Sequence, residues 1–315
     1  MYDVIGDVHG YADALVRLLA KLGYSDSRGC WRHPERTAVF LGDLVDRGPE
    51  IGRVLDVVRR MIDLGAARAV MGNHEFNIIA FFTPDPAKSG EFLRPHSEKN
   101  IEQCRATLEQ LSVSETDEAL GWLKGLPLWL DLGGLRVIHA CWDPLKQKDA
   151  QDTFARNGGY ITENFIVEAC EKGTATHNAI EVVLKGKEAK LPDGVSFFDK
   201  DGNERHHVPI RWYLDPAGRN WREYAFVFRP KEKDLMPDGL ITKEIEESAV
   251  PYAKTEPPIL FGHYWIPGHL RPGSLAANVA CLDYSVAKGG RLCAYRWDGE
   301  SVLDDDKFVS VSAES

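Results

Sequence analysis

Five short apolar runs along the chain each end in a cluster of polar residues, and this recurrence limits the possible fold more than any other feature. The runs and their ends read YDVIGDVHG, TAVFLGDLVDRGP, ARAVMGNHE, LRVIHACWD and PILFGHYW. Short apolar runs that alternate with helical patterns are typical of buried strands in an α/β fold. The carboxyl ends of the strands of an open α/β sheet open onto one crevice. We therefore expect the five polar clusters to meet at a single site.

The polar residues at these strand ends are carboxylates, imidazoles, an amide and a guanidinium. They are Asp7, His9, Asp43, Asp46, Arg47, Asn73, His74, His139 and His263. Asp7 and His9 are two apart in an extended segment, so their side chains point to the same side and can bind one ion. A single Asp or His at a strand end is most often a satisfied turn or core group. Coincidence is a poor explanation for so many of them at successive strand ends.

Six of these residues are candidate metal ligands and lack any thiolate. They are Asp7, His9, Asp43, Asn73, His139 and His263. Such a set suits two divalent ions, with Mn first and Fe or Zn as alternatives, rather than a structural Cys-type zinc. Two carboxylates leave two divalent ions with about two uncompensated positive charges, and the neutral amide of Asn73 does not reduce that charge. The sequence therefore predicts a site for anions.

The composition excludes several classes of protein. A chain of 315 residues with 43% hydrophobic residues can fill a globular core, and its net charge of −10 argues against an extended nucleic-acid surface. The six cysteines form no C-x-x-C pair, which is typical of reduced thiols. The chain shows no pattern of a signal peptide or of a membrane-spanning segment. We expect a cytoplasmic protein without a membrane partner, and the oligomeric state is left open.

Changes in composition and motif content along the sequence divide the chain into four parts. Residues 1–144 are the expected first part of the core, and residues 258–302 its second part. Residues 145–257 are turn-rich and more charged, with a hairpin pattern at FFDKDGNERHH, which indicates an insertion or cap. Residues 303–315 are largely polar and are predicted to form a flexible tail.

The motifs GDVHG, GDLVDRGP, GNHE, VIHA and FGHYW resemble, in order and spacing, the signature of the calcineurin-like metallophosphoesterases. The resemblance is closest to the phosphoprotein phosphatase branch, which includes lambda-phage-type Ser/Thr phosphatases and bacterial symmetrical diadenosine tetraphosphatases. It covers roughly residues 1–143 and 258–298. It implies a mixed α/β fold, a four-layer αββα sandwich with two mixed sheets and an inserted cap. It further implies one metal held by Asp7, His9 and Asp43, and a second held by Asp43 as a bridge with Asn73, His139 and His263.

The chemistry of phosphoryl transfer assigns roles to the remaining strand-end residues. Arg47 would clamp the phosphate together with Asn73, and a metal-bridging hydroxide would attack it directly. His74 would protonate the leaving oxygen, with Asp46 holding its tautomer. The related phosphatases carry a downstream Trp-x-Arg motif that supplies a second phosphate arginine, and ITENFIVEA lacks it. Arg219 and Arg222, with Arg211 as a further candidate, are the predicted substitutes.

Three functions are consistent with this set of residues. The first is a phosphatase acting on phosphoprotein or small phosphomonoesters, and the alternative is a hydrolase of symmetrical dinucleoside polyphosphates or other nucleotide anhydrides. The third, a non-catalytic phosphate-binding protein, gives no reason to keep His74, Asp46 and Arg47 beside the ligands. Five aromatic residues are expected to pack the seam between cap and core rather than stack a nucleobase. They are Trp212, Tyr213, Trp221, Tyr264 and Trp265.

Overall fold

The computed structural model describes residues 1–198, 204–228 and 233–314. The helices are α1 (Ala12–Lys21), α2 (Ile51–Asp63), α3 (Asn73–Phe82), α4 (Glu98–Gln110), α5 (Val113–Leu123), α6 (Pro144–Arg156), α7 (Glu163–Cys170), α8 (Ala175–Lys185), α9 (Trp221–Tyr224) and α11 (Lys243–Ser248). The strands are β1 (Tyr2–Ile5), β2 (Ser25–Ser27), β3 (Cys30–Arg32), β4 (Thr37–Phe40), β5 (Ala67–Ala69), β6 (Trp129–Asp131), β7 (Arg136–Ile138), β8 (Glu188–Lys190), β9 (Phe197–Phe198), β10 (Glu204–Arg205), β11 (His207–Pro209), β12 (Ile259–Phe261), β13 (Val279–Cys281), β14 (Asp283–Tyr284), β15 (Arg291–Trp297) and β16 (Phe308–Ser312).

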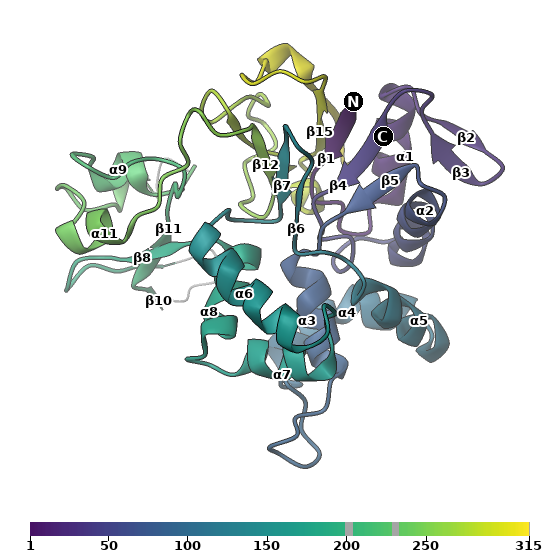
Figure 1. Cartoon of the computed structure of the whole chain (residues 1–315), viewed down its shortest axis with the longest axis horizontal. Coiled ribbons are helices and arrows are strands. Elements are labelled where there is room, and N and C mark those ends of the chain that lie inside the picture. The colour runs from purple at the N-terminus through teal and green to yellow at the C-terminus, as the bar shows by residue number, and fades with distance from the viewer. Residues whose placement is uncertain (199–203, 229–232, 315) are drawn as a thin grey trace.

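Two mixed sheets form the centre of the molecule (Figure 1). One has the order β14-β15-β1-β4-β5, with β16 on β15, and within it β1, β4 and β5 run parallel. The other has the order β13-β12-β7-β6, and within it β7, β12 and β13 run parallel. The five apolar runs are thus divided between two sheets. This arrangement confirms the predicted mixed α/β class.

The first two helices cover the six-stranded sheet with apolar faces. Leu15, Leu18 and Leu19 of α1 are buried, and α1 packs on β15 and β16. Val54 and Val58 of α2 are buried in the same way, and α2 packs on β5. Their spacing of three and four residues places them on one side of each helix. These helices leave the carboxyl ends of β1, β4 and β5 open.

The predicted insertion, residues 145–257, separates into two structural parts. Helices α6, α7 and α8 pack on one another and bury apolar side chains in the main core. Buried residues between Ala189 and Ile241 form a second, smaller hydrophobic cluster, which we call the insertion core. Figure 1 shows β8, β11, α9 and α11 of this part far from β1, β4 and β5. The predicted hairpin pairs β9 with β10, and its turn residues 199–203 lie outside the described residues.

The prediction of a flexible tail after residue 302 was wrong for most of that segment. Strand β16 pairs antiparallel with β15, from Tyr295 opposite Phe308 to Arg291 opposite Ser312. Its side chains are half-buried, and α1 packs against it. An edge strand gains its partner's hydrogen bonds even when alternate side chains are polar. The alternation of Phe308 to Ser312 is the signal that the prediction missed.

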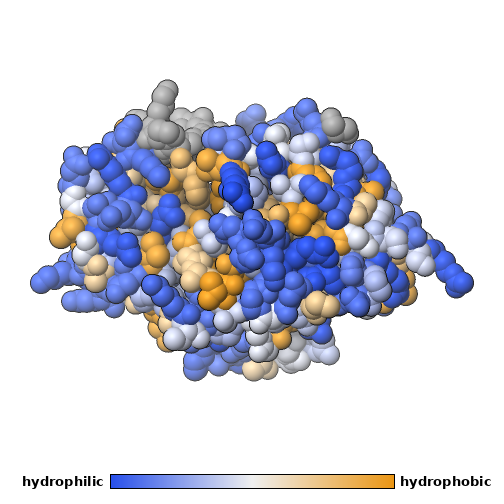
Figure 2. Space-filling model, turned by 90° about the horizontal axis from the view of Figure 1, so that it is seen from above, coloured by the Kyte–Doolittle hydropathy of each residue, from blue (hydrophilic) through white to orange (hydrophobic). Residues whose placement is uncertain are grey.

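The surface is predominantly hydrophilic on the face drawn in Figure 2, with hydrophobic residues in smaller groups between the polar ones. Across the described residues, no helix combines the length and apolar character needed to cross a bilayer.

Candidate active site and metal centre

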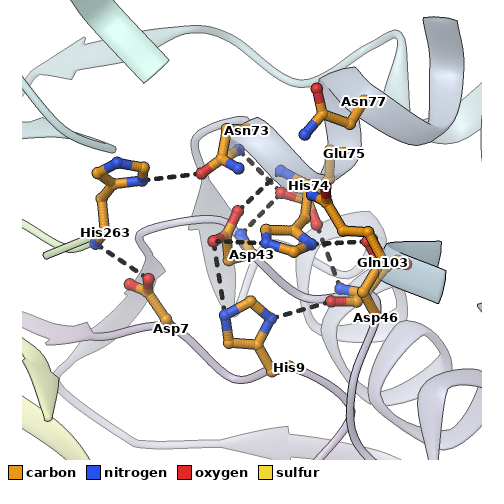
Figure 3. A network of polar contacts seen from close by, with 12 residues as sticks. Asp7, His9, Asp43, Asp46, Asn73, His74, Glu75, Asn77, Gln103 and His263 are labelled. Carbon is orange, nitrogen blue, oxygen red and sulfur yellow. Dashed lines mark hydrogen bonds and ion pairs between the residues drawn. The ribbon is translucent and has the colours of Figure 1, made fainter. Parts of the chain in front are cut away.

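The predicted site residues lie at the carboxyl ends of strands from both sheets. Asp7 and His9 follow β1, Asp43 follows β4, and Asn73 begins α3 after β5. His139 directly follows β7 of the second sheet, and His263 follows β12. Figure 3 shows Asp7, His9, Asp43, Asn73 and His263 directed toward one another. The structure therefore brings together the residues that the strand-end pattern selected.

A single glycine allows the two sheets to approach each other at this point. A Cβ atom on Gly262 would lie 1.9 Å from Oδ1 of Asp7, closer than any real contact. The amide of Gly262 donates to the carbonyl of His139 at 2.8 Å, and the next amide, of His263, donates to Oδ2 of Asp7 at 3.0 Å. Glycine at position 262 is therefore needed for Asp7 of one sheet to reach the strand ends of the other.

The backbone at the site is held in a sparsely populated conformation. Positive φ angles occur at His9 (46°), Asp43 (49°), Asp46 (67°), Arg47 (72°), His263 (75°) and Trp265 (53°). In the described chain, only two other non-glycine residues, Arg28 and Ser285, have φ in this region. Such angles cost about 1–3 kcal/mol each and persist where the surroundings enforce them, most often at functional sites.

Glu75 of the GNHE motif enforces part of this geometry, a role that the sequence analysis did not assign. Its carboxylate is fully buried and accepts backbone N–H groups from Asp43 (2.7 Å), Leu44 (2.7 Å), Val45 (3.2 Å) and Gly72 (2.8 Å). Burial and the nearby Asp43 raise the pKa of Glu75 to about 7, and the backbone donors oppose that rise. Glu75 thus ties the loop after β4 to the start of α3.

Several possible metal-ligand atoms face one another around His139. Nδ1 of His139 lies 2.7 Å from the carbonyl oxygen of Leu41, which can only accept, so Nδ1 carries a proton. In the neutral ring Nε2 is then a lone pair, and it lies 3.0 Å from Oδ1 of Asn73 and 3.4 Å from Oδ1 of Asp43. Nδ1 of His263 is 2.9 Å from the same oxygen of Asn73. Such a convergence of imidazole nitrogens with an amide oxygen and a carboxylate oxygen is suited to a cation.

A second group of acceptor atoms lies on the other side of Asp43. Nδ1 of His9 faces the carbonyl of Val45 at 3.1 Å, while its buried Nε2 has no hydrogen-bond partner and lies 3.5 Å from Oδ2 of Asp43. Oδ1 of Asp7 is likewise buried without a partner. Burial lowers the pKa of His9 to about 3, so its ring is neutral and able to ligate.

Asp43 lies between the two groups and faces a different imidazole with each carboxylate oxygen. Ligand atoms of Asp7, Asp43 and His139 lie within 4.8 Å of one another, and so do those of His9, Asp43 and His74. Burial opposes ionisation of Asp43, but the imidazoles of His139, His74 and His9, when protonated, and the backbone amide of His74 lower its pKa below the ordinary value. The residues present therefore fit two divalent ions that share Asp43.

His74 differs from the other imidazoles because a carboxylate already engages it. Its Nδ1 lies 2.6 Å from Oδ2 of Asp46, and its Nε2 is 4.0 Å from Oδ2 of Asp43. Burial opposes protonation of His74, but Asp43 and Asp46 outweigh it and raise its pKa. A protonated ring cannot bind a metal but can donate a proton.

Thr107 of α4 fixes the other side of Asp46, and no sequence pattern pointed to it. Its hydroxyl donates to Oδ1 of Asp46 at 2.5 Å and accepts the amide N–H of Asp46 at 3.0 Å. Gln110, one turn further along the helix, accepts from the amide of Ile51 and donates to the carbonyl of Gly48. Helix α4 is thereby held in register with the loop that carries Asp46 and Arg47.

A pocket of about 650 Å³ opens over these groups. Its walls are Asp43, Arg47, Asn73, His74, Lys99, Glu102, Gln103, Arg105, Ala106, Glu109, His263 and Trp265. Half of these residues come from α4, to which the sequence analysis assigned no functional role. The pocket therefore combines the predicted strand-end residues with charged side chains of α4, which the strand-end pattern could not indicate.

The arginines predicted in the insertion do not join the site. Arg222 pairs with Asp238 at 2.9 Å, and Nε of Arg219 donates to the carbonyl of Asp215 at 2.7 Å. Neither lines the pocket that contains Asp43 and Arg47, as far as the structure describes the chain. Arg211 lies over the rings of Phe226 and Phe228 and donates to the hydroxyl of Tyr213. The structure therefore places Arg219 and Arg222 away from this pocket, which does not support the prediction that they contact substrate.

The predicted aromatic residues divide into buried packing groups and one pocket residue. Trp212, Tyr213 and Trp221 are buried in the hydrophobic clusters, as expected for packing residues. The ring of Tyr264 packs against Phe226 and Phe261. Trp265 is only partly buried and lines the pocket beside Arg47. Its position was not anticipated.

Comparison with known proteins agrees with this geometry. Residues 2–264 match the family model of the calcineurin-like phosphoesterases. The asymmetrical bis(5'-nucleosyl)-tetraphosphatase of Bacillus velezensis is 35% identical over 146 residues, which is 44% of this chain and 55% of that protein. The chain thus spans about half the length of the first curated relatives it matches. The symmetrical bis(5'-nucleosyl)-tetraphosphatase of Acidovorax sp. strain JS42 is 34% identical over 96% of this chain and 94% of its own.

Among solved structures, a protein serine/threonine phosphatase from Saccharomyces cerevisiae aligns with all of this chain and 79% of its own, with 16% identity and a TM-score of 0.47. A likeness of this size says nothing of substrate. The family model covers most of the chain, and the Acidovorax relative covers nearly all of it. The chain belongs to the calcineurin-like phosphoesterase family.

Proposed function

We propose that the protein is a metal-dependent hydrolase that cleaves dinucleoside tetraphosphates. The observation that carries this proposal is the group of buried ligand atoms around Asp43, among which Oδ1 of Asp7 and Nε2 of His9 have no hydrogen-bond partner, beside a pocket lined by Arg47 and His74. A merely structural cluster would satisfy its buried polar atoms with donors. A phosphate-binding protein without activity would not need the proton donor.

The residues of the cluster divide into ion-binding groups and groups that act on the substrate. Asp7, His9 and Asp43 would hold one ion, and Asp43 with Asn73, His139 and His263 the other. Divalent ions at such a site offset phosphate charge and lower the pKa of water, which supplies a nucleophile at neutral pH.

Two residues would act directly on the substrate. Arg47 presents a planar fork that matches two phosphate oxygens and binds the negative charge of the phosphoryl group. His74, held by Asp46, would protonate the departing oxygen. Because Asp46 engages Nδ1 of His74, Nε2 is the nitrogen that would deliver the proton.

The choice of substrate departs from the main prediction made from sequence, which was a phosphomonoester. Relatives named as tetraphosphatases support the alternative, and the Acidovorax protein, named as symmetrical, aligns with nearly the full chain. The pocket itself does not choose between the substrates, because α4 lines it with Lys99 and Arg105 but also with Glu102, which forms an ion pair with Arg105, and with Glu109.

Product analysis with the Mn-loaded protein tests the proposal. Diadenosine tetraphosphate should be hydrolysed to ADP alone if cleavage is symmetrical, and the reaction should stop in excess chelator and resume when Mn is restored. A phosphopeptide and nitrophenyl phosphate, at equal concentration, serve as comparison substrates. If the products are ATP and AMP, cleavage is asymmetrical instead of symmetrical. A higher kcat/KM for the phosphopeptide would return the assignment to a phosphomonoesterase, and activity retained after verified metal removal would refute the metal-dependent mechanism.

A further inference from the structure

We infer that Trp265 is a positioning residue that holds the guanidinium of Arg47 in place for the phosphate. The inference deepens the proposed function and rests on it, because that proposal assigns Arg47 to phosphate binding. Neither the strand-end pattern nor the chemistry of the reaction selects Trp265. Its contacts and its backbone do.

The indole ring of Trp265 contacts both kinds of active-site group. The guanidinium carbon of Arg47 lies 4.6 Å from the ring centroid, within the range of a cation–π interaction. The imidazole of His9 stacks against the same indole, with centroids 5.4 Å apart and planes inclined by 21°. Trp265 therefore lies between a proposed metal ligand and the proposed phosphate-binding side chain.

A second cation also lies over this indole. Nζ of Lys288 is 3.6 Å from the ring centroid. Two cationic heads on one ring are attracted by its electron-rich faces, which lowers the cost of keeping them near each other. Lys288 is exposed and does not line the pocket, whereas Arg47 does, so Arg47 is the cation on this ring that is placed to meet an anionic substrate.

The backbone of Trp265 is fixed in a conformation that a tryptophan rarely adopts. Its φ angle is 53°, in the left-handed region, and it is the one residue of the strained set at the pocket that the sequence analysis gave no chemical role. Its amide donates to Oδ2 of the buried Asp283 at 2.6 Å, and the other oxygen of Asp283 accepts the amide of Ser285 at 2.9 Å. Backbone strain enforced by a buried carboxylate is typical of functional positions.

The arrangement explains how Arg47 can be held without a carboxylate partner. In the part of the chain that the structure describes, no ion pair is recorded for Arg47, and its φ angle of 72° is itself strained. A carboxylate beside the guanidinium would compete with phosphate, whereas an aromatic face orients it and leaves its N–H donors available. An indole is therefore the better support for an arginine that must bind and release an anion.

Binding of inorganic phosphate to the Mn-loaded protein, followed by titration calorimetry, tests the inference without requiring turnover. Trp265→Leu removes the aromatic face, Trp265→Phe keeps a smaller one, and Trp31→Leu on strand β3 is the matched control. The dissociation constant for phosphate should rise roughly 3- to 30-fold in Trp265→Leu, the range expected for a lost cation–π contact. It should rise less in Trp265→Phe and stay unchanged in Trp31→Leu.

A double-mutant cycle separates positioning of Arg47 from a general structural effect. Replacing Trp265 by leucine in an Arg47→Ala background should cause little further loss of phosphate affinity, because the residue that Trp265 orients is already absent. An additional loss as large as in the wild-type background would overturn the inference. So would loss of bound Mn in Trp265→Leu, because that result would assign the ring to His9 rather than to Arg47.

The same variants distinguish failure of this inference from failure of the proposed function. If wild-type protein binds phosphate through Arg47 and hydrolyses its substrate, but Trp265→Leu matches wild type in phosphate affinity, only the role of Trp265 is refuted. If Arg47→Ala binds phosphate as tightly as wild type, the assignment of Arg47 in the proposed function fails, and the role of Trp265 fails with it.

Discussion

The cluster around Asp43 and the insertion core between residues 189 and 241 are built on opposite principles. The cluster gathers buried polar side chains from the ends of strands in two sheets, and strained backbone holds them. The insertion core gathers apolar side chains from nearby segments, and its arginines lie on the surface in local contacts. The cluster around Asp43 positions polar side chains at the cost of stability, whereas the insertion core stabilises the fold by burying apolar side chains. Substitutions in the two regions should therefore affect different measurements.

The largest effect should come from Asp43→Asn. The substitution removes the carboxylate that faces both imidazole groups, so we expect bound metal and turnover to be lost together while the fold is retained. Metal content by elemental analysis and hydrolysis of nitrophenyl phosphate measure the two losses. Asp238→Asn, at an acidic residue of the insertion, is the matched control and should alter neither. Wild-type metal content in Asp43→Asn would contradict the role of Asp43 as the residue shared by both ions.

His74→Asn should lower turnover without removing metal. The loss should be about 10²- to 10⁴-fold for an alkyl phosphate, whose leaving oxygen needs a proton, and much smaller for nitrophenyl phosphate. Asp46→Asn should show the same selectivity in milder form, because Asp46 acts only through His74. Steady-state rates on both esters, with metal content checked, measure this. Equal losses on the two esters, with chemistry rate-limiting, would remove the acid role from His74.

Trp221→Ala should have the opposite effect to the active-site variants. It should lower the free energy of unfolding and leave the rate of hydrolysis unchanged. Trp221 is 1% exposed in the insertion core, and truncating such a side chain costs about 3–5 kcal/mol of unfolding free energy. Denaturant unfolding measures the loss, and nitrophenyl phosphate hydrolysis of the folded variant should stay near wild type. Leu240→Ala, at a residue 65% exposed, is the control with little expected effect. A large drop in kcat for folded Trp221→Ala would couple the insertion to the active site.

Arg222→Ala should have the smallest effect. The Arg222 and Asp238 side chains are 50% and 88% exposed, and exposed ion pairs contribute about 0–1 kcal/mol. Activity on every phosphate substrate should equal that of wild type, with Arg219→Ala as a companion variant. A change in selectivity among substrates in either variant would restore the insertion arginines to the site.

The cluster of candidate metal ligands could be predicted from sequence because strand direction decides where strand ends meet. Asp7, Asp43 and Asn73 follow parallel strands of one sheet, and His139 and His263 follow parallel strands of the other. A local motif at each strand end is then enough to place its side chain. The apolar faces of α1 and α2 are equally local, because residues spaced three and four apart fall on one side of a helix.

The residues that sequence reasoning missed act through contacts between distant segments. Thr107 meets Asp46 across 61 positions of sequence, and no local pattern distinguishes it from other threonines. The orientation of α4 over the pocket also depends on tertiary packing. The arginines of the insertion were nominated by residue type alone, and the insertion core places them elsewhere. Glu75 was visible within GNHE, but its four backbone donors appear only in the folded loops.

Strand β1 leads directly into Asp7 and His9 of the candidate site, yet its antiparallel neighbour is β15, so Tyr2 lies opposite Trp297. During translation, one edge of β1 thus lacks its native partner until the distant strand β15 has been made. An unpaired strand edge invites association with other chains. A nascent or truncated chain that stops before Arg291 should accordingly depend on chaperones for solubility, and Asp7 should acquire its final position only after β15 has paired with β1.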